Sequence, residues 1–319
     1  MTRMRILVPG GCGYVGAMLV PHLASDGHVV TVFDSQLFGD GGLPKENPHI
    51  ISIKGDIRNK EDFEKACEGQ EAVIYLAGIT NNDICGKPEA ESINTTAFPI
   101  AVTCAKRAGV KRFILASSVA VYGSSDKDAD EGHEVRPTTK YGQGKHFCET
   151  WANLVKSKDF AVTIVRSASV CGDSSRMRFD TTVNKMVHDA CKTGVITVNG
   201  GDQKRSHISM QDICRAYKQL VNIPVEIIAG QTFNYVTENQ MVKETAEIVA
   251  EASGAKIVHK PHSDDRSYSV SGYKARKVLG FEPKQTITEA IEHLVALFQG
   301  GYLSWKDLSD DKYKNIVAL

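Results

Sequence analysis

Three side chains near the middle of the sequence are suited to proton transfer at a hydroxyl group. Tyr141 and Lys145 are four residues apart, and Ser118 precedes Tyr141 by 23 residues. Residues four apart share one face of a helix. An ammonium beside a tyrosine favours the phenolate that a general base requires. The sequence therefore predicts Tyr141 as the base, Lys145 as its activating cation and Ser118 as the hydroxyl that holds the substrate oxygen. The pair alone would also fit an ordinary helix surface.

A glycine-rich turn near the start of the chain is typical of a site for a dinucleotide diphosphate. The apolar run Ile6-Leu7-Val8 leads into Pro9-Gly10-Gly11-Cys12-Gly13-Tyr14-Val15-Gly16. Glycine permits the tight turn and lets the backbone approach a diphosphate. The N–H groups at the start of a following helix favour negative charge. Glycine turns without a ligand are also common, but the strand before this one and the helix after it favour cofactor binding. The residues predicted to bind the cofactor here are Gly10, Gly13, Tyr14, Val15 and Gly16.

An aspartate after the second expected strand favours NAD over NADP. Asp34 lies 18 residues after Gly16, close to the spacing at which a carboxylate binds the adenosine ribose. Its charge would repel a 2′-phosphate, and the following Ser35-Gln36 contains no arginine that could bind one. The alternative is a solvated loop aspartate. Asp56 and Ile57 follow the third expected strand and are predicted to meet the adenine.

A parallel sheet wrapped by helices would bring these residues together. Short β-branched runs alternate with amphipathic stretches through the first half of the chain, which is typical of a doubly wound α/β fold. The expected strands are Arg5–Val8, Val29–Phe33, Ile50–Lys54, Ala72–Ala77, Arg112–Ser117 and Ala161–Arg166. The expected helices are Tyr14–Ser25, Asn59–Cys67, Glu89–Ala108 and Thr138–Lys156.

The second half has a less regular pattern. We expect helices at Thr182–Lys192, Gln211–Val221, Met241–Ala252 and Ile287–Gln299, strands at Val195–Val198 and Gln231–Tyr235, a basic loop at Asp202–His207 and a loosely held tail at Ser309–Leu319. Because no flexible linker separates the halves, we expect them to pack together. Residues 1–168 would bind the cofactor and residues 169–319 mainly the substrate, with a strand near 231–235 returning to the first sheet.

Composition excludes several classes of function. The 38 Lys and Arg balance the 38 Asp and Glu, so the chain lacks the net positive charge that would attract nucleic acid. No apolar run is long enough to span a membrane. The eight cysteines are scattered without a C-x-x-C pair, which predicts buried thiols in a cytoplasmic protein and no metal site.

The combined motifs resemble the extended short-chain dehydrogenase/reductases that act on nucleotide sugars. The resemblance covers essentially the whole chain and rests on the glycine turn, Gly55-Asp56-Ile57, Leu76-Ala77-Gly78, Asn94, the Ser117–Gly123 segment and the Tyr141/Lys145 pair. It implies a Rossmann domain that binds NAD, a smaller C-terminal α/β domain for the nucleotide diphosphate, and a homodimer built on a four-helix interface. Ala77, Gly78, Asn94 and Tyr141 would contact the cofactor, and Lys145 would also hold the nicotinamide ribose.

Later motifs resemble the substrate-domain signatures of UDP-galactose 4-epimerase-like and GDP-heptose 4-dehydrogenase-like members. They are Ser175-Arg176-Met177-Arg178-Phe179-Asp180, Arg205-Ser206-His207-Ile208 and Asp265-Arg266-Ser267-Tyr268. Guanidinium groups match phosphate oxygens, so Arg205 and Arg266 are predicted to bind the substrate diphosphate. Arg176 and Arg178 are further candidates, with ion pairs that organise a loop as the alternative. Thr80, after the fourth strand, is expected to face the sugar.

Two departures from the family pattern bear on the reaction. Ser169 stands where UDP-galactose 4-epimerases usually have asparagine, which counts against plain galactose epimerisation. Val119 and Ala120 stand where 4,6-dehydratases have Asp-Glu, and these two apolar side chains cannot transfer protons. The sequence thus disfavours an ordinary 4,6-dehydratase.

The reaction predicted from these residues is oxidation of a nucleotide sugar at C4. Tyr141 would take the 4-hydroxyl proton as hydride passes to NAD, which leaves a 4-keto sugar. Return of the hydride to the other face would make the protein an epimerase, which is the favoured prediction. Release of the keto sugar would make it a 4-dehydrogenase, or a 4-ketoreductase in reverse. A non-catalytic dinucleotide-binding sensor is a more distant alternative, since it does not require Tyr141 and Lys145.

Overall fold

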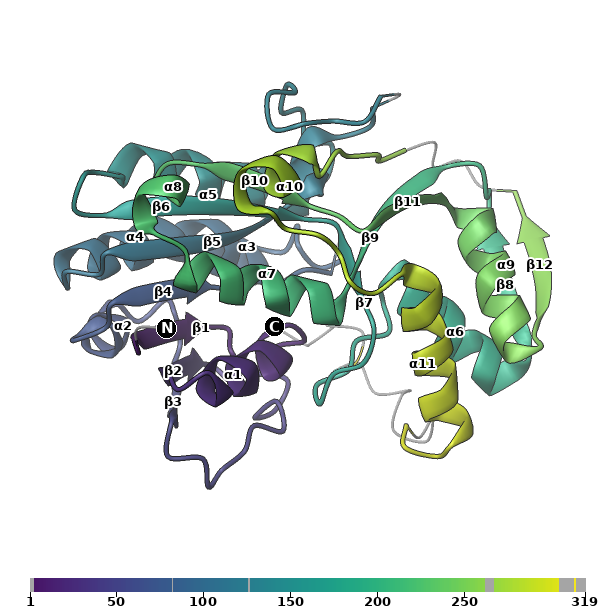
Figure 1. The fold of residues 1–319 in the computed structure, drawn as a ribbon, viewed down its shortest axis with the longest axis horizontal. Coiled ribbons are helices and arrows are strands. Elements are labelled where there is room, and N and C mark those ends of the chain that lie inside the picture. The colour runs from purple at the N-terminus through teal and green to yellow at the C-terminus, as the bar shows by residue number, and fades with distance from the viewer. Residues whose placement is uncertain (1–2, 82, 126, 262–266, 304–312, 314–319) are drawn as a thin grey trace.

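The computed structural model describes residues 3–81, 83–125, 127–261, 267–303 and 313. A seven-stranded sheet with the strand order β3-β2-β1-β4-β5-β6-β10 forms the larger half (Figure 1). All of its paired strands are parallel. This order is that of a Rossmann sheet with one added strand, which confirms the predicted doubly wound fold. The strands are β1 (Arg5–Pro9), β2 (Val29–Asp34), β3 (Ile50–Lys54), β4 (Ala72–Tyr75), β5 (Arg112–Ser118), β6 (Ala161–Ser167) and β10 (Thr232–Tyr235).

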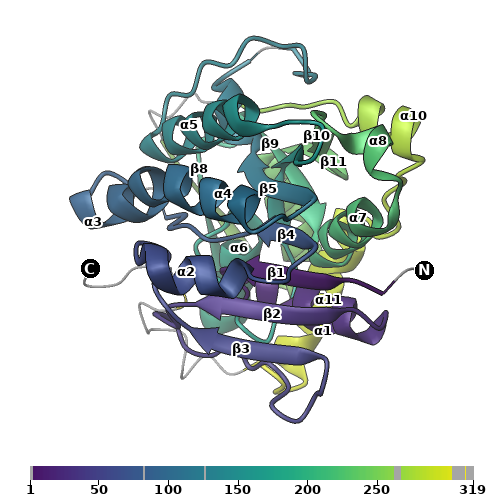
Figure 2. The ribbon, with the colours of Figure 1, turned by 90° about the vertical axis from the view of Figure 1, so that its left-hand side faces the viewer.

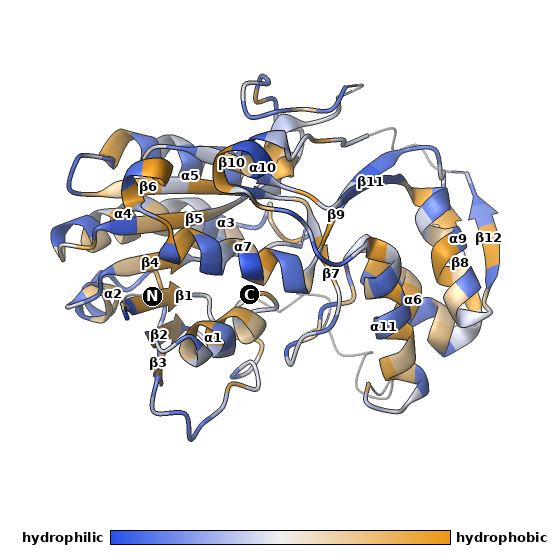
Figure 3. Cartoon of the chain, in the orientation of Figure 1, coloured by the Kyte–Doolittle hydropathy of each residue, from blue (hydrophilic) through white to orange (hydrophobic). Residues whose placement is uncertain are grey.

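Helices cover both faces of this sheet. On one face lie α2 (Lys60–Cys67), α4 (Ala97–Arg107) and α5 (Lys140–Val155), and on the other lie α1 (Gly16–Ser25) and α7 (Met210–Asn222) (Figure 2). Hydrophobic and hydrophilic residues alternate in bands along the helices (Figure 3), as expected where one side of each helix packs against a sheet. Short helices α8 (Val225–Ile228) and α10 (Tyr273–Leu279) lie near β10.

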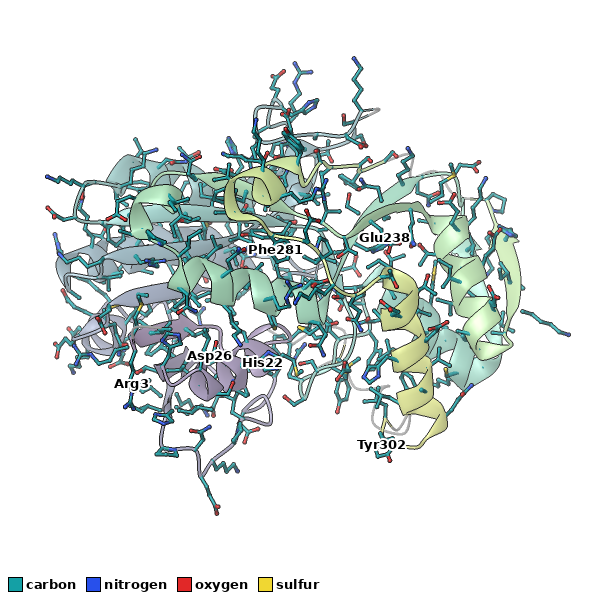
Figure 4. All side chains as sticks on the ribbon, in the orientation of Figure 1. Arg3, His22, Asp26, Glu238, Phe281 and Tyr302 are labelled. Carbon is teal, nitrogen blue, oxygen red and sulfur yellow. The ribbon has the colours of Figure 1, made fainter. Side chains whose placement is uncertain are left out.

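An ion pair links α1 to α7, although they are far apart in the sequence. Asp26 ends α1 (Figure 4), and its carboxylate accepts a hydrogen bond from Lys218 Nζ of α7 at 3.0 Å. The late helix α7 therefore completes the layer that α1 begins, and the second half of the chain contributes to the first sheet.

The segment expected as one helix at Glu89–Ala108 is interrupted. It consists of α3 (Pro88–Glu91), a π-helical turn η1 (Ser92–Thr96) and α4. A π turn adds one residue to the helix repeat and is frequent at functional sites. It shifts the side chains that precede α4, among them Asn94.

In its described residues, the smaller half contains two short sheets and three helices. The strands β7 (Ser169–Cys171), β9 (Lys204–Ser209) and β11 (Glu238–Met241) form one sheet in the order β11-β9-β7, and β8 (Val195–Asn199) pairs with β12 (Lys256–Lys260). Helices α6 (Thr182–Thr193), α9 (Val242–Ser253) and α11 (Ile287–Gln299) pack beside them. Strands and helices thus alternate here, as expected for a smaller α/β unit.

The prediction of a basic loop at Asp202–His207 was wrong. Residues 204–207 belong to β9, which pairs with β11 on one side and β7 on the other. The strand was not predicted because it contains charged residues, whereas strands are predicted from runs of apolar β-branched residues. Of the predicted tail Ser309–Leu319, all but Tyr313 lies outside the described residues, and the Tyr313 carbonyl accepts the Phe179 N–H at 2.8 Å.

Membrane-spanning helices and metal clusters are both absent from the described residues. Within the ranges given above, no helix is long and apolar enough to cross a membrane. Over the same ranges, no group of three His, Cys, Asp or Glu side chains is placed to hold a metal ion.

Candidate active site

A cleft of about 560 Å³ opens at the carboxyl ends of the parallel strands. Residues of both halves line it, as expected where ligands bind a doubly wound sheet. Most of the predicted site residues lie in its wall: Gly10, Gly13, Tyr14, Val15, Gly16, Asp34, Asp56, Ile57, Ala77, Gly78, Thr80, Ser118, Tyr141, Lys145, Arg176, Arg178 and Arg205. The structure therefore brings together residues from both halves of the sequence.

The glycine turn has the close backbone contacts that a diphosphate site requires. Gly10 has φ +81°, and a Cβ there would lie 2.6 Å from the Ala77 nitrogen. A Cβ at Gly16 would lie 2.6 Å from Gly11 Cα. No side chain caps the N-terminus of α1, where Tyr14, Val15 and Gly16 line the cleft. Backbone N–H groups and the helix dipole are thus positioned for an anion.

Asp34 lies at the end of β2 and also holds the turn. Its carboxylate accepts hydrogen bonds from the Cys12 N–H at 3.0 Å and the Gln36 N–H at 2.7 Å. Burial raises the pKa of Asp34, and these two N–H groups oppose that shift. The carboxylate still lines the cleft, where it is available to ribose hydroxyls.

Asp56 and Ile57 lie beyond β3 at the same end of the cleft. The Asp56 carboxylate accepts from Arg58 Nε at 3.0 Å, and this hydrogen bond lowers the pKa of Asp56. Ile57 is buried and packs in the same apolar cluster as Phe33. This corner combines a polar edge with an apolar wall, which suits a flat base.

Ser118, Tyr141 and Lys145 line the same cleft. Ser118 ends β5, and its Oγ accepts the Ala120 N–H at 3.2 Å. Tyr141 and Lys145 lie in the first turns of α5, with Lys145 Nζ 5.8 Å from the centre of the Tyr141 ring. Nζ also donates to the Ala116 carbonyl at 2.7 Å. A substrate hydroxyl here would meet a hydroxyl, a phenol and an ammonium group.

Asn94 has a different environment from the one the sequence implied. Among the described residues that line the cleft it does not appear. Its side-chain amide instead makes two hydrogen bonds to the backbone of Ile79. Oδ1 accepts the Ile79 N–H at 2.7 Å, and Nδ2 donates to the Ile79 carbonyl at 2.9 Å. A Cβ on Gly78 would lie 3.2 Å from Asn94 Oδ1. Asn94 therefore positions the loop that carries Gly78 and Thr80.

A buried ion pair fixes α5 against the sheet. Arg166 of β6 donates from Nε and Nη2 to the two oxygens of Glu149 on α5, at 2.9 and 2.7 Å. The Ser117 hydroxyl donates to the same carboxylate at 2.5 Å. Burial lowers the pKa of Arg166, but the hydrogen bonds and charge of Glu149 outweigh it and raise that pKa overall. Glu149 thus connects the helix of Tyr141 to the strand end of Ser118.

The four predicted arginines have different surroundings. Arg178 donates through Nε and Nη2 to Asp180, at 2.5 and 3.0 Å. Arg205 has its guanidinium carbon 5.1 Å from the centre of the Tyr268 ring. Arg176 lies 4.4 Å from the Phe38 ring centre by the same measure. Arg266 lies outside the described residues.

Comparison with known proteins assigns the chain to a family. The sequence pattern of the NAD dependent epimerase/dehydratase family matches residues 6–235. The chain belongs to this family. It is therefore an NAD-dependent enzyme of the epimerase/dehydratase type, as the sequence resemblance implied.

Relatives and solved structures of this family agree along most of the chain. The chain is 26% identical to a UDP-glucose 4-epimerase of Mycolicibacterium smegmatis over 316 residues, covering 93% of this chain and 99% of that protein. It is 26% identical to UDP-glucuronic acid decarboxylase 1 of Danio rerio, covering 93% and 73%. The fold is similar to that of a UDP-glucose 4-epimerase from Thermotoga maritima, with a TM-score of 0.83, 23% identity and 94% and 100% of the two chains covered.

Several residues of the cleft were not predicted from the sequence. Phe38, Asp180 and Tyr268 line it, and each contacts one of the predicted arginines. Asp180 and Tyr268 stood inside the motifs that carried the resemblance, so those motifs were the available signal. Phe38 follows Asp34 in an irregular loop, where no sequence pattern indicates its contact with Arg176.

Proposed function

We propose that the protein is an NAD-dependent nucleotide-sugar epimerase that acts through oxidation at C4. The observation that carries the proposal is the meeting of Ser118, Tyr141 and Lys145 in one cleft with the glycine turn. Val119 and Ala120 line the same cleft and carry no ionisable group, so elimination of water across C5 and C6 lacks an acid and a base. The relatives named as 4-epimerases support the same assignment.

Each residue of the trio has a proposed role. The Tyr141 phenolate oxygen accepts the proton of the 4-hydroxyl, and the resulting phenol returns it at the end of the cycle. Ser118 donates to the developing keto oxygen, since its Oγ accepts from Ala120 and keeps its O–H hydrogen for the substrate. Lys145 stabilises the phenolate and binds the nicotinamide ribose. When bound, NAD accepts the C4 hydrogen as hydride and returns it.

The cofactor and substrate are assigned to different parts of the cleft. Residues 1–168, together with β10, bind NAD through the glycine turn, Asp34, Asp56, Ile57, Ala77 and Gly78, while Asn94 positions Gly78. Residues 169–319 bind mainly the nucleotide diphosphate, with Arg205 facing its phosphates and Thr80 of the first half facing the sugar, while Arg266 lies outside the described residues. Arg178 forms an ion pair with Asp180, and both residues line the same cleft.

A 4-dehydrogenase is the second candidate. Ser169 lines the cleft where 4-epimerases of the family usually have asparagine, and a changed contact at this point would alter how the keto sugar is held. The catalytic trio would serve both reactions. A sensor without chemistry is disfavoured because the trio is complete.

We also propose a homodimer and a cytoplasmic location. Ile100 of α4 and Phe147 and Leu154 of α5 are exposed, with Leu154 at 70%. Such apolar side chains on two adjacent helices fit the four-helix interface that the resemblance implies. None of the eight cysteines is in a disulfide, which fits a reducing compartment.

A panel of UDP-, dTDP-, GDP- and CDP-sugars tests the proposed reaction. Each is incubated with the protein and NAD, while NADH absorbance and product NMR are followed together. A 4-epimer formed without net NADH supports the proposal. Stoichiometric NADH with a keto sugar would establish the dehydrogenase instead, and absence of conversion across the panel would contradict both.

A further inference from the structure

A segment of the smaller half lies directly on the cofactor loops. The Ser174 hydroxyl donates to the Tyr14 carbonyl at 2.8 Å, within the glycine turn. The Ser175 hydroxyl donates to the Gly41 carbonyl at 2.7 Å, in the loop after β2. The two hydrogen bonds join residues more than 130 positions apart in the sequence. They attach this segment to both sides of the site proposed for the diphosphate and ribose of NAD.

The Tyr14 side chain strengthens the same attachment. Its hydroxyl donates to the Gly172 carbonyl at 2.7 Å and accepts from Asn184 Nδ2 at 2.9 Å. Asn184 Oδ1 in turn accepts the Gly172 N–H at 3.0 Å. All of these groups are buried, so the hydrogen bonds hold one arrangement of the segment over the turn.

Arg176 extends from this segment toward the cofactor side of the cleft. Its N–H donates to Ser174 Oγ at 3.2 Å, which places its backbone above Tyr14. Its guanidinium carbon lies 4.4 Å from the centre of the Phe38 ring, and Phe38 is four residues after Asp34. Arg176 is only 5% exposed, yet it lines the cleft together with Asp34 and Phe38. The side chain is thus held between the glycine turn and the loop that follows Asp34.

The electrostatics at Arg176 favour an anionic ligand. Burial lowers the pKa of Arg176 to about 10, and the positive charge of Arg178 acts in the same direction. Asp180, Asp34 and Tyr313 oppose that shift. A diphosphate in the cleft would add negative charge beside a desolvated guanidinium, where charge-assisted hydrogen bonds are strong.

We propose that Arg176 binds the diphosphate of the dinucleotide cofactor, in place of the substrate diphosphate that the sequence predicted for it. Both halves of the molecule then hold the cofactor: the glycine turn through its N–H groups and the smaller half through a guanidinium. This inference rests on the proposed function only in taking NAD as the ligand. It implies that the cofactor leaves only when residues 174–176 separate from Tyr14 and Gly41, which suits a cycle that keeps NADH bound until the sugar is reduced.

Binding measurements without any sugar test this assignment. Isothermal titration compares NAD, NADH and ADP-ribose, which share the diphosphate, with adenosine, which lacks it. Loss of a charge-assisted interaction predicts that Arg176→Gln weakens NAD, NADH and ADP-ribose about 10- to 100-fold and leaves adenosine unchanged. Arg176→Lys keeps the charge and is expected to recover part of the loss.

Arg205→Gln is the matched control, because Arg205 lines the same cleft from β9. We expect it to weaken binding of UDP, dTDP, GDP or CDP and to leave NAD affinity at the wild-type value. Arg176→Gln is expected to show the opposite pattern. Because no turnover is measured, failure of the sugar panel would leave this result interpretable.

Several results would overturn the assignment. Wild-type NAD affinity in Arg176→Gln would do so, as would a loss confined to nucleoside diphosphates or to NADP. An equal loss of affinity for adenosine would show that Arg176 supports the cleft only by packing and does not bind the diphosphate. If Arg176→Gln does not fold, Phe38→Leu tests the same geometry, since it removes the ring that orients the guanidinium. It should weaken NAD a few-fold, and unchanged affinity would contradict the proposal.

Discussion

Tyr141 is a residue whose chemistry can be separated from its packing. Replacing it with phenylalanine removes one oxygen and keeps the ring that packs near Ile79 and Ile84. Loss of a positioned base predicts a fall in kcat of about 10²- to 10⁴-fold, with a much smaller change in NAD affinity because the ring is kept. Steady-state kinetics on the substrate that the panel identifies measures the first quantity, and titration measures the second.

Tyr273→Phe is the control for that substitution. Tyr273 is 60% exposed on α10, so its hydroxyl should not affect turnover. Wild-type kcat in Tyr141→Phe would remove Tyr141 from the proposed mechanism. A large effect of Tyr273→Phe would show that the comparison reports on stability.

His207 makes stability depend on pH. It is fully buried in β9, neither ring nitrogen has a hydrogen-bond partner among the described residues, and burial lowers its pKa to about 4 from 6.5. Between these pH values the unfolded chain binds a proton that the folded chain does not, so stability falls as the pH falls. The full interval corresponds to about 3 kcal/mol, and the loss becomes negligible about one pH unit above 6.5.

Urea unfolding at pH 7.5 and pH 4.5 measures this effect in the wild type and in His207→Gln. The wild type should lose more stability between the two pH values than the variant does, by about 2–3 kcal/mol. His259→Gln, on the exposed face of β12, should behave as the wild type. Equal pH dependence of the free energy of unfolding in wild type and His207→Gln would show that folding does not lower the pKa of His207.

The position of a residue in the cleft could be predicted from the sequence for some residues and not for others. Ser118, Tyr141, Lys145 and the glycine turn follow local spacing rules, so their positions in one cleft could be predicted. The choice between cofactor and substrate for Arg176 depends on Phe38 and Tyr14, which are more than 130 positions away. The ion pair of Arg178 with Asp180 was foreseen only as an alternative, because spacing does not determine whether an arginine faces a ligand or a carboxylate.

Helix α5 depends on the buried pair of Glu149 and Arg166. Glu149→Gln keeps the shape of the side chain but leaves the Arg166 guanidinium buried without its carboxylate. Breaking such a pair predicts a loss of about 3–5 kcal/mol in the free energy of unfolding. Because Tyr141 is carried by the same helix, we also expect kcat to fall while NAD affinity stays within a few-fold of the wild type.

Urea unfolding and steady-state kinetics measure both effects, with Glu251→Gln on α9 as the control. Glu251 is exposed, so this variant should match the wild type in each measurement. If Glu149→Gln kept a free energy of unfolding within about 1 kcal/mol of the wild type, that result would be incompatible with a structural role for the pair.

Elements with a clear apolar period were predicted closely, and polar ones were not. The bounds of α11 match the expectation Ile287–Gln299, since its apolar residues face the core and Thr286 caps it. Strands β9 and β11 consist mainly of polar residues and are stabilised by pairing with each other, and only Arg205 and Ser206 of β9 line the cleft among their described residues. The π turn at Ser92–Thr96 was also not predicted, because the pattern of residues 89–108 as a whole is that of a continuous helix.

The whole molecule carries an exposed apolar surface on α4 and α5. If it forms the dimer interface, Leu154→Glu places a charge where two copies meet and should convert the dimer to a monomer. Light scattering after size-exclusion chromatography measures the mass. Val258→Glu on β12 of the smaller half is the control and should remain dimeric. A monomeric wild type, or a dimeric Leu154→Glu protein, would contradict the proposed interface.

The proposed reaction cycle is tested most directly by the C4 hydrogen of the sugar. Conversion in D₂O of the substrate that the panel identifies, followed by proton NMR of the product, shows whether that hydrogen exchanges with solvent. The proposal predicts a 4-epimer that keeps its original H4 and carries no deuterium at C4 or C5, because the hydrogen leaves and returns as hydride within the cleft. Deuterium at either carbon, or a keto sugar released with stoichiometric NADH, would contradict it.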